Sequence, residues 1–341
     1  MKIHKNSIFL FSITFVLMTA KCAGKLDHNI NLSTPMSIPV TESYPPIFID
    51  GNKALETFIE EKGLKGNGTI DSPYIIENFV INASTAHGIL IQNTDAYLTI
   101  RDCTIESGGT NYKDGINLKD TTNVKIHNNF LSNNKYGIYL VSSNNITISG
   151  NIVNNNAWHG IALESSSKNF ILGNNASNNE AGIRLYTLSS NNTLLGNTVS
   201  YNDDGIILRY FSSSNVLANN TFTNNKDFGI SLYTSSNNNV SWNRFLSNNL
   251  GGSSQAHDNN PDLDNSFRYN YWDDWIGPDA NNDGIVDVPY YIDGTAGNQD
   301  QYPLSIPHIT TTIPGNIISG SIILSIILGT FIILSYKQKR E

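Results

Sequence analysis

The sequence has few of the residues that form disulfides or soft-metal sites. Its 341 residues include two cysteines, Cys22 and Cys103, and three methionines. Because Cys22 falls in the leader region described below, no internal disulfide is expected even in an oxidising compartment. Stability must therefore come from packing and hydrogen bonds.

Positive charge is also scarce. Lysine and arginine number 21 against 29 aspartates and glutamates, which gives a formal net charge of −8, and only 15% of the residues are charged. A chain of this composition lacks the basic surface that binding to DNA or RNA requires. Its 39% of hydrophobic residues nevertheless supports a folded body, so a wholly disordered chain is excluded as well.

Asparagine, in contrast, is abundant, with 49 residues, and much of it follows a repeat. Gly-Ile pairs recur every 22 to 24 residues after one longer first interval. Their glycines are Gly88, Gly115, Gly137, Gly160, Gly182, Gly205 and Gly229. Two asparagine columns keep the same period, one from Asn129 to Asn270 and one from Asn134 to Asn248. A fixed period of this length is typical of a solenoid.

Within each repeat, apolar and polar residues alternate over three to five positions, as at Ile161 and Leu163. Such runs, bounded by Asn, Ser and Gly, predict short strands joined by tight turns. Strands this short bury their apolar side only by stacking on neighbouring coils. The pattern therefore predicts an all-β chain, a parallel β-helix of about nine coils with about 4.8 Å between equivalent residues. Asparagine suits its turns because it tolerates the left-handed backbone and its stacked amides can form ladders.

The two ends differ from this body. Residues 1–24 combine Lys2 and Lys5 with an apolar run and then small polar residues, which predicts a signal peptide. Residues 317–336 carry no charge and precede the basic tail 337–341, which predicts a membrane-spanning helix with a cytoplasmic tail; a buried core helix is the alternative. We therefore expect an exported protein, anchored in the cell membrane with its body outside.

Four segments are expected between these ends. Residues 25–69 form an N-terminal segment in which residues 54–62 have helical apolar spacing, which predicts an amphipathic helix capping the first coil. The β-helix spans residues 70–270, a C-terminal cap spans 271–304, and a short linker containing proline and threonine spans 305–316.

Three stretches resemble a known family. They are the coils between residues 73 and 249, the entry Ser72-Pro73-Tyr74-Ile75-Ile76-Glu77-Asn78, and a tail containing Asn270-Tyr271-Trp272-Asp273. Together they resemble the NosD-type repeat proteins, which have the right-handed parallel β-helix of pectin-lyase-like proteins. The resemblance implies that fold and leaves the function open, because such β-helices include sugar hydrolases, lyases, epimerases, binding proteins and a copper-site maturation factor.

Copper handling is the least supported of these functions. A copper site needs clustered His, Met or Cys. His87, His127 and His159 lie in different coils or columns, and Met36 is the only methionine beyond the predicted signal peptide.

Calcium is the metal that the sequence favours. The segment from residue 279 to 287 matches the first part of an EF-hand-like loop, with Gly284 at the sharp bend. The expected oxygen ligands at positions 1, 3, 5, 7 and 9 are Asp279, Asn281, Asp283, the carbonyl of Ile285, and Asp287. Tyr290 stands where the bidentate glutamate would be. We expect a structural Ca²⁺ that holds the cap; an ordinary turn is the alternative.

Three acids occupy the same place, two residues before the glycine, in successive coils: Glu180, Asp203 and Asp227. Stacking would put neighbours about 4.8 Å apart and the outer pair about 9.6 Å apart, which brackets the carboxylate separations of retaining and inverting glycosidases. They are candidate catalytic residues of a polysaccharide hydrolase or lyase. The favoured interpretation is a non-catalytic face, because stacked acids on a repeat surface can be structural.

Aromatic and basic residues occupy the same coils. The candidate carbohydrate-binding residues are Trp158, His159, Arg184, Tyr186, Asp204, Arg209 and Tyr233. Aromatic rings offer flat faces to sugars, and guanidinium groups offer paired donors. The favoured function is therefore binding of a polysaccharide or cell-surface glycan along one solenoid face. A hydrolase or lyase and a purely structural spacer are the alternatives.

Overall fold

The computed structural model describes residues 43–260 and 264–307. The predicted signal peptide, membrane-spanning helix and tail therefore lie outside the described residues. Within the described ranges, no helix is both long enough and apolar enough to cross a membrane.

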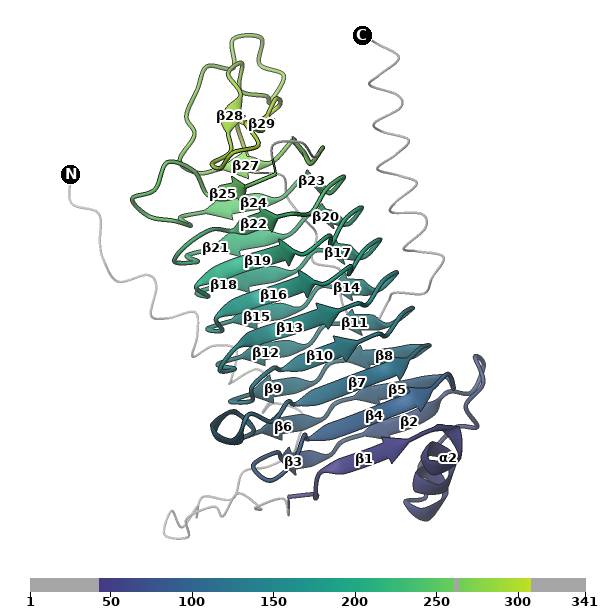
Figure 1. The fold of residues 1–341 in the computed structure, drawn as a ribbon. Coiled ribbons are helices and arrows are strands. Elements are labelled where there is room, and N and C mark those ends of the chain that lie inside the picture. The colour runs from purple at the N-terminus through teal and green to yellow at the C-terminus, as the bar shows by residue number, and fades with distance from the viewer. Residues whose placement is uncertain (1–42, 261–263, 308–341) are drawn as a thin grey trace, which may run out of the picture. The chain divides into compact units, whose positions relative to one another are not determined.

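The described residues wind as a right-handed parallel β-helix with three sheets, A, B and C (Figure 1). Sheet B contains β1 (Ile47–Asp50), β4 (Ile89–Thr94), β7 (Ile116–Thr121), β10 (Ile138–Val141), β13 (His159–Glu164), β16 (Ala181–Tyr186), β19 (Asp204–Arg209), β22 (Ile230–Tyr233) and β25 (Ala256–Asp258). Sheet C contains β2 (Tyr74–Glu77), β5 (Leu98–Arg101), β8 (Val124–His127), β11 (Thr147–Ser149), β14 (Phe170–Leu172), β17 (Thr193–Leu195), β20 (Val216–Ala218), β23 (Asn239–Ser241), β26 (Ser266–Arg268), β29 (Gln299–Asp300) and β28 (Tyr290–Tyr291). Sheet A contains β3 (Val80–Asn82), β6 (Thr104–Glu106), β9 (Phe130–Ser132), β12 (Ile152–Asn154), β15 (Asn175–Ser177), β18 (Thr198–Ser200), β21 (Thr221–Thr223), β24 (Arg244–Leu246) and β27 (Tyr271–Trp272).

Sheets A and B each stack nine strands, which corresponds to about eight turns. The expectation of about nine coils is thus one too high, because nine stacked strands are separated by eight turns. The stack also extends beyond the expected range 70–270. At the N-terminal end, β1 pairs with β4. At the C-terminal end, β29 pairs with β26 and then, in the antiparallel direction, with β28.

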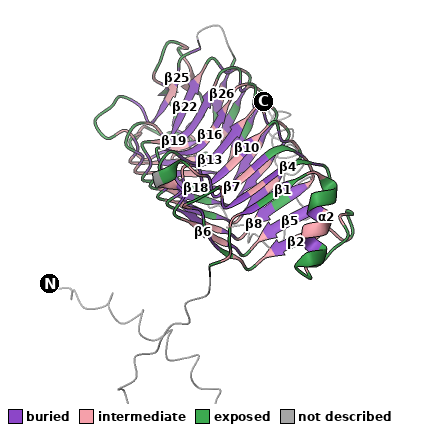
Figure 2. Cartoon of the chain, turned by 60° about the horizontal axis from the view of Figure 1, so that its bottom comes forward, coloured by how far each residue is buried: buried purple, intermediate pink, exposed green. Residues whose placement is uncertain are grey.

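Apolar residues in register form the core. In sheet B, Ile161 aligns with Ile183, which aligns with Ile206, and all three side chains are completely buried. Figure 2 shows the buried residues along the strands and many of the exposed ones at the turns. A continuous apolar column of this kind is buried only while the coils stay in register, so packing and register stabilise each other.

The asparagine columns form the expected ladders. Asn174 donates from its backbone nitrogen and from Nδ2 to Oδ1 of Asn197, at 2.9 and 3.0 Å, and Nδ2 also donates to the carbonyl of Ile148. The column through Asn179 and Asn202 repeats this pattern. These bonds satisfy buried amides that would otherwise lack partners.

One short α-helix, α2 (Asn52–Glu61), packs against β1 and β2, with Leu55 and Ile59 buried. It lies at the N-terminal end of the stack (Figure 1), as the helical spacing of residues 54–62 predicts. Among the described residues, a 3-10 turn at Gly109–Asn111 interrupts an early coil.

Candidate functional site

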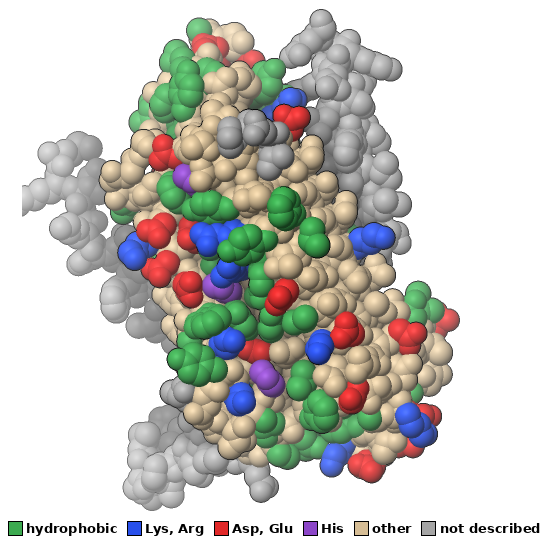
Figure 3. All heavy atoms as spheres, in the orientation of Figure 1, with side chains coloured by type: hydrophobic (Ala, Val, Ile, Leu, Met, Phe, Trp, Pro, Cys, Tyr) green, Lys and Arg blue, Asp and Glu red, His purple; other side chains and the backbone are tan. Residues whose placement is uncertain are grey.

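The outer face of sheet B gathers the polar and aromatic side chains of the central coils. Over β7 to β22, Figure 3 shows basic, acidic, histidine and hydrophobic side chains close together, whereas the adjoining surface is mostly backbone and uncharged polar side chains. Glu164 is in register with Tyr186, and Arg209 is in register with Tyr233. The structure therefore places the predicted binding residues Tyr186, Arg209 and Tyr233 on one face of sheet B.

Each of two arginines lies over a tyrosine ring of this face. The guanidinium carbon of Arg184 is 5.0 Å from the ring centroid of Tyr186, and that of Arg209 is 4.3 Å from the centroid of Tyr233. Such stacking leaves the edge of a guanidinium group available for hydrogen bonds. Within the described residues, the buried Nε atoms of Arg184 and Arg209 have no hydrogen-bond partner.

Three oxygen atoms meet beside Arg184. The hydroxyl of Tyr186 donates to Oε2 of Glu164 at 2.8 Å, and the hydroxyl of Tyr139 contacts the same oxygen. The two tyrosine oxygens are 2.7 Å apart. Burial raises the pKa of both tyrosines well above its usual value, so both remain protonated at neutral pH. This cluster fixes the two rings and supports the arginine stacked on Tyr186.

His159 is buried beneath this face, with 1% of its surface exposed. Its Nε2 lies 2.8 Å from the Nη1 nitrogen of Arg184. Because a guanidinium group only donates, Nε2 accepts, and the proton of the neutral ring is on Nδ1. Burial, reinforced by Arg184, Arg209 and Lys135, lowers the pKa of His159 to about 3. His159 therefore orients Arg184 as a neutral acceptor.

The remaining predicted binding residues lie at the edges of this face. Asp204 accepts a hydrogen bond from Ser231 at 2.9 Å, and burial raises its pKa despite that bond. Trp158 is 39% exposed, and the Lys135 ammonium lies 4.3 Å from the centroid of its ring. Trp158 therefore offers an accessible ring beside His159.

Two residues of this region were missed in the sequence. Tyr136 is buried, its ring centroid is 5.4 Å from that of His159, and burial raises its pKa to about 12. Lys135 and Tyr136 precede Gly137 as Trp158 and His159 precede Gly160. The repeat alignment, extended by one coil, would have found both.

The candidate catalytic acids lie at the turns that enter sheet B. Glu180, Asp203 and Asp227 are all exposed. The amide of Asp227 donates to the carbonyl of Asp203 at 2.7 Å, so their backbones stack as expected. Oδ1 of Asp203 is 3.4 Å from the ammonium of Lys226. These acids therefore face water at one edge, whereas the tyrosines and arginines occupy the sheet itself.

The predicted calcium loop forms a compact turn. Asp279 accepts from the amides of Asp283 and Gly284, both at 3.0 Å, and Asp283 accepts from the amide of Ile285 at 2.9 Å. Asn281 also accepts from Asp283 at 3.0 Å, and Asp287 accepts from Ala280 at 2.9 Å. In the described part of the chain, no group of three or more His, Cys, Asp or Glu side chains is placed to hold a metal ion. Calcium therefore stays a prediction.

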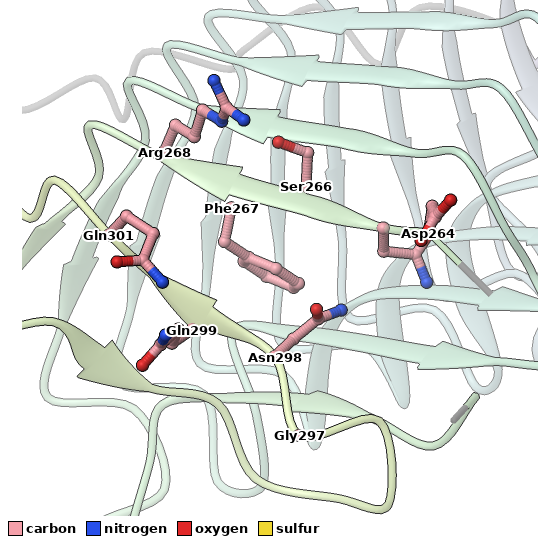
Figure 4. Close-up of a pocket in the computed structure, with 9 residues that line it drawn as sticks. Asp264, Ser266, Phe267, Arg268, Gly297, Asn298, Gln299 and Gln301 are labelled. Carbon is pink, nitrogen blue, oxygen red and sulfur yellow. The ribbon is translucent and has the colours of Figure 1, made fainter. Parts of the chain in front are cut away.

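A separate hollow lies at the C-terminal end of sheet C. Its lining includes Phe267 and Arg268 of β26 and Asn298, Gln299 and Gln301 near β29, as Figure 4 shows. None of the predicted site residues lines it, and its lining is mainly polar amide and charged groups without the stacked rings of sheet B.

Comparison with known proteins agrees with this architecture. The family model described as "Periplasmic copper-binding protein (NosD)" matches residues 75–291.

The structure resembles the A-module of mannuronan C-5 epimerase AlgE6 from Azotobacter vinelandii, at 18% identity, over 56% of this chain and 57% of that one, with a TM-score of 0.43. It also resembles PfbA, a surface adhesin of Streptococcus pneumoniae, at 17% identity, over 50% of this chain and 54% of that one, with a TM-score of 0.42. A third similar structure is an alginate lyase from Paenibacillus sp. str. FPU-7, at 13% identity, over 67% of this chain and 88% of that one, with a TM-score of 0.41. No match was found among curated proteins. At these identities the likeness to solved structures concerns the fold alone.

The described residues do not fit a copper ion. His159 uses Nε2 for Arg184, and His87 accepts the amide of Asp114 at Nδ1. Burial raises the pKa of the Cys103 thiol to about 11, which keeps it protonated and poorly suited to bind a metal. All three methionines, which could supply soft ligands, lie outside the described ranges.

Proposed function

The chain belongs to the NosD family, and we propose that it is a non-catalytic glycan-binding protein whose ligand lies on the outer face of sheet B. One observation carries the proposal: two guanidinium groups, each stacked on a tyrosine ring, lie on adjacent coils of one sheet. Flat apolar surface beside fixed donors is the combination that recognises a sugar ring and its hydroxyl or carboxylate groups.

The network beneath the arginines supports binding because it restricts their motion. Arg184 is held by His159 at one side and by Tyr186 at the other, and Tyr186 is held by Glu164. A preorganised side chain loses little conformational entropy when a ligand binds. The stacked arginines therefore suit recognition of an extended chain that crosses several coils.

The hydrolase or lyase alternative has less support. Its candidate acids, Glu180, Asp203 and Asp227, are exposed, and Asp203 is paired with Lys226. General acid catalysis by a carboxyl group is favoured by a desolvated site, which an exposed turn does not provide.

We also propose, from the sequence alone, that the protein is exported by residues 1–24 and anchored by residues 317–336. A glycan-binding face outside the cell would then meet extracellular polysaccharides. Cell fractionation and protease accessibility of the intact chain test this location.

The binding proposal is tested by titration calorimetry of the purified protein against alginate, polygalacturonate and dextran. We expect Arg184→Ala and Arg209→Ala to weaken binding of the preferred polysaccharide at least about tenfold, because each removes a stacked donor plane. Arg244→Ala is the matched control, since Arg244 also has an unpartnered buried Nε but lies on sheet A. Equal affinity of wild type and both sheet B variants would contradict the proposal. Reducing-sugar release that Asp203→Asn abolishes would favour the enzyme instead.

A further inference from the structure

Two adjacent coils carry an extra residue at the turn that follows sheet B. After β10 and β22, one residue separates the last strand residue from a completely buried serine, as Ser142 does before Ser143. After β16 and β19 there are two residues: Thr187 and Leu188 before Ser189, and Tyr210 and Phe211 before Ser212. The serines remain buried in their column, so the extra residue is accommodated outward.

The extra residues adopt a backbone conformation that large side chains seldom take. The φ angles are 63° at both Leu188 and Phe211, and 55° at Tyr210. The corresponding single residues of other coils include Asn93, Asp120 and Ser142, which are smaller or polar. Left-handed backbone disfavours bulky side chains, so the choice of Leu, Tyr and Phe here is not explained by the turn itself.

These side chains also face water. Leu188, Tyr210 and Phe211 are 61%, 55% and 61% exposed, and we name them the apolar ledge. The amide of Leu188 donates to the carbonyl of Tyr210 at 2.9 Å, which places the two turns side by side. Local strain and exposed apolar surface both oppose stability, and their coincidence on neighbouring coils points to a ligand.

The ledge is continuous with the proposed glycan site. Leu188 follows Tyr186 of β16 after one residue, and Tyr210 directly follows Arg209 of β19. The side chains of Tyr186 and Arg209 lie on the outer face of sheet B. In Figure 3, hydrophobic side chains stand beside the basic ones over these two strands. The ledge is therefore only a few strand residues away from the arginines. A glycan bound to the arginines reaches it.

We propose that the apolar ledge binds a pyranose ring of the same glycan, through stacking of the ring's C–H face on Phe211 and Tyr210. This inference rests on the proposed function and names a further subsite of it. An aromatic side chain covers one face of a sugar ring and leaves its hydroxyl edge hydrated. The exposed surface of three side chains is large enough to cover one such ring. It is far smaller than the roughly 800 Å² that each partner of a stable protein interface buries.

The test compares Phe211→Asn and Leu188→Asn with wild type in the full chain, using the polysaccharide that binds wild type most tightly among alginate, polygalacturonate and dextran. Asparagine tolerates φ above zero, so we expect a thermal midpoint equal to or higher than that of wild type. We expect the dissociation constant to rise about tenfold for Phe211→Asn, because a stacking surface is lost. Tyr201→Asn is the matched control: Tyr201 is 60% exposed at φ 56°, but its turn precedes β19, and we expect no change in affinity.

The outcomes separate this subsite from the proposed function. If Phe211→Asn binds like wild type while Arg184→Ala binds weakly, the ledge is overturned and the sheet B site stands. If Tyr201→Asn loses as much affinity as Phe211→Asn, the ledge is also overturned, because the effect is then general to exposed tyrosine and phenylalanine. If Arg184→Ala and Arg209→Ala both bind like wild type, or wild type binds none of the three polysaccharides, both proposals fail.

Discussion

At the scale of single residues, His159 links burial to pH dependence. Its pKa of about 3 lies below the value of 6.5 for an exposed histidine. Between these values the unfolded chain binds a proton that the folded chain does not. The contribution of the neutral ring to the free energy of unfolding is therefore fully present above pH 6.5. It decreases by about 1.4 kcal/mol for each pH unit as the pH falls from 6.5 to about 3.

We expect His159→Gln, which keeps an acceptor for Arg184, to remove this slope. The measurement is the free energy of unfolding in urea at several values between pH 7 and pH 4. Burial raises the pKa of Asp204, Asp258 and Asp300, so these groups favour the folded state as pH falls, and only the difference between variant and wild type isolates His159. An identical pH slope in variant and wild type would show that His159 is protonated in the folded protein.

At the scale of elements, the ladders need an acceptor at their last rung. Each amide donates to the next coil, so the final one must meet an acceptor from outside the ladder. Asp300 accepts from the amide and Nδ2 of Asn270, both at 2.9 Å, and from Trp272 Nε1 at 3.2 Å. The ladder through Asn248 ends at Gln255, whose Nε2 donates to Asp273 and Asp274.

Asp300→Ala should therefore lower the free energy of unfolding by about 3 kcal/mol or more, because several buried donors lose an acceptor together. Chemical denaturation followed by circular dichroism measures this change. Asp71→Ala serves as control, since Asp71 is exposed. A loss below about 1 kcal/mol would mean that the ladder end relaxes onto other acceptors.

The Asp-rich loop of the cap gives a second prediction at this scale. If Asp279, Asn281, Asp283, the Ile285 carbonyl and Asp287 hold Ca²⁺, adding a chelator should lower the thermal midpoint by about 5 °C. The double variant Asp279→Ala, Asp283→Ala should have the lower midpoint already and no longer respond to the chelator. If neither calcium nor chelator changes the thermal midpoint of wild type, the loop is an ordinary hydrogen-bonded turn and the calcium prediction is wrong.

The elements also show what the sequence could and could not predict. The Gly-Ile strands and the columns through Asn129 and Asn134 follow from a strict period, because stacked coils repeat the same environment. β1 was missed, because Ile47 and Ile49 alternate like a strand but lack the repeat's glycine and asparagine. The buried ladder from Asn169 to Asn265 was missed too, although it keeps the period, because its amides become partners only once the turn geometry is known.

The site was predictable to a similar extent. A fixed period is enough to place Glu164 beside Tyr186, and Arg209 beside Tyr233, in neighbouring coils. They could not predict that Arg184 would bond to His159, because that contact joins two different columns. Contacts between columns depend on side-chain conformations, which one-dimensional spacing does not contain.

At the scale of the whole molecule, the β-helix is a stack in which each coil contacts mainly its neighbours. The ladder residues Asn174 and Asn197 are 23 residues apart, so deletion of residues 175–197 removes one complete coil and leaves all columns in register. We expect the shortened protein to fold with a β-type circular dichroism spectrum and a lower thermal midpoint.

Deletion of residues 175–186 is the control for this shortening. It removes half a coil and shifts every later strand onto the wrong sheet, so we expect no cooperative unfolding transition. Equal behaviour of the two deletions would contradict a repeat in which register, rather than chain length, determines folding.

Glycan binding on sheet B is best tested by a crystal structure of the protein with an oligosaccharide of the polysaccharide it binds most tightly. We expect electron density for sugar rings on the outer face of sheet B, in contact with Arg184 and Arg209. Sugar density confined to sheet A, or to the hollow between Phe267 and Gln299, would contradict it.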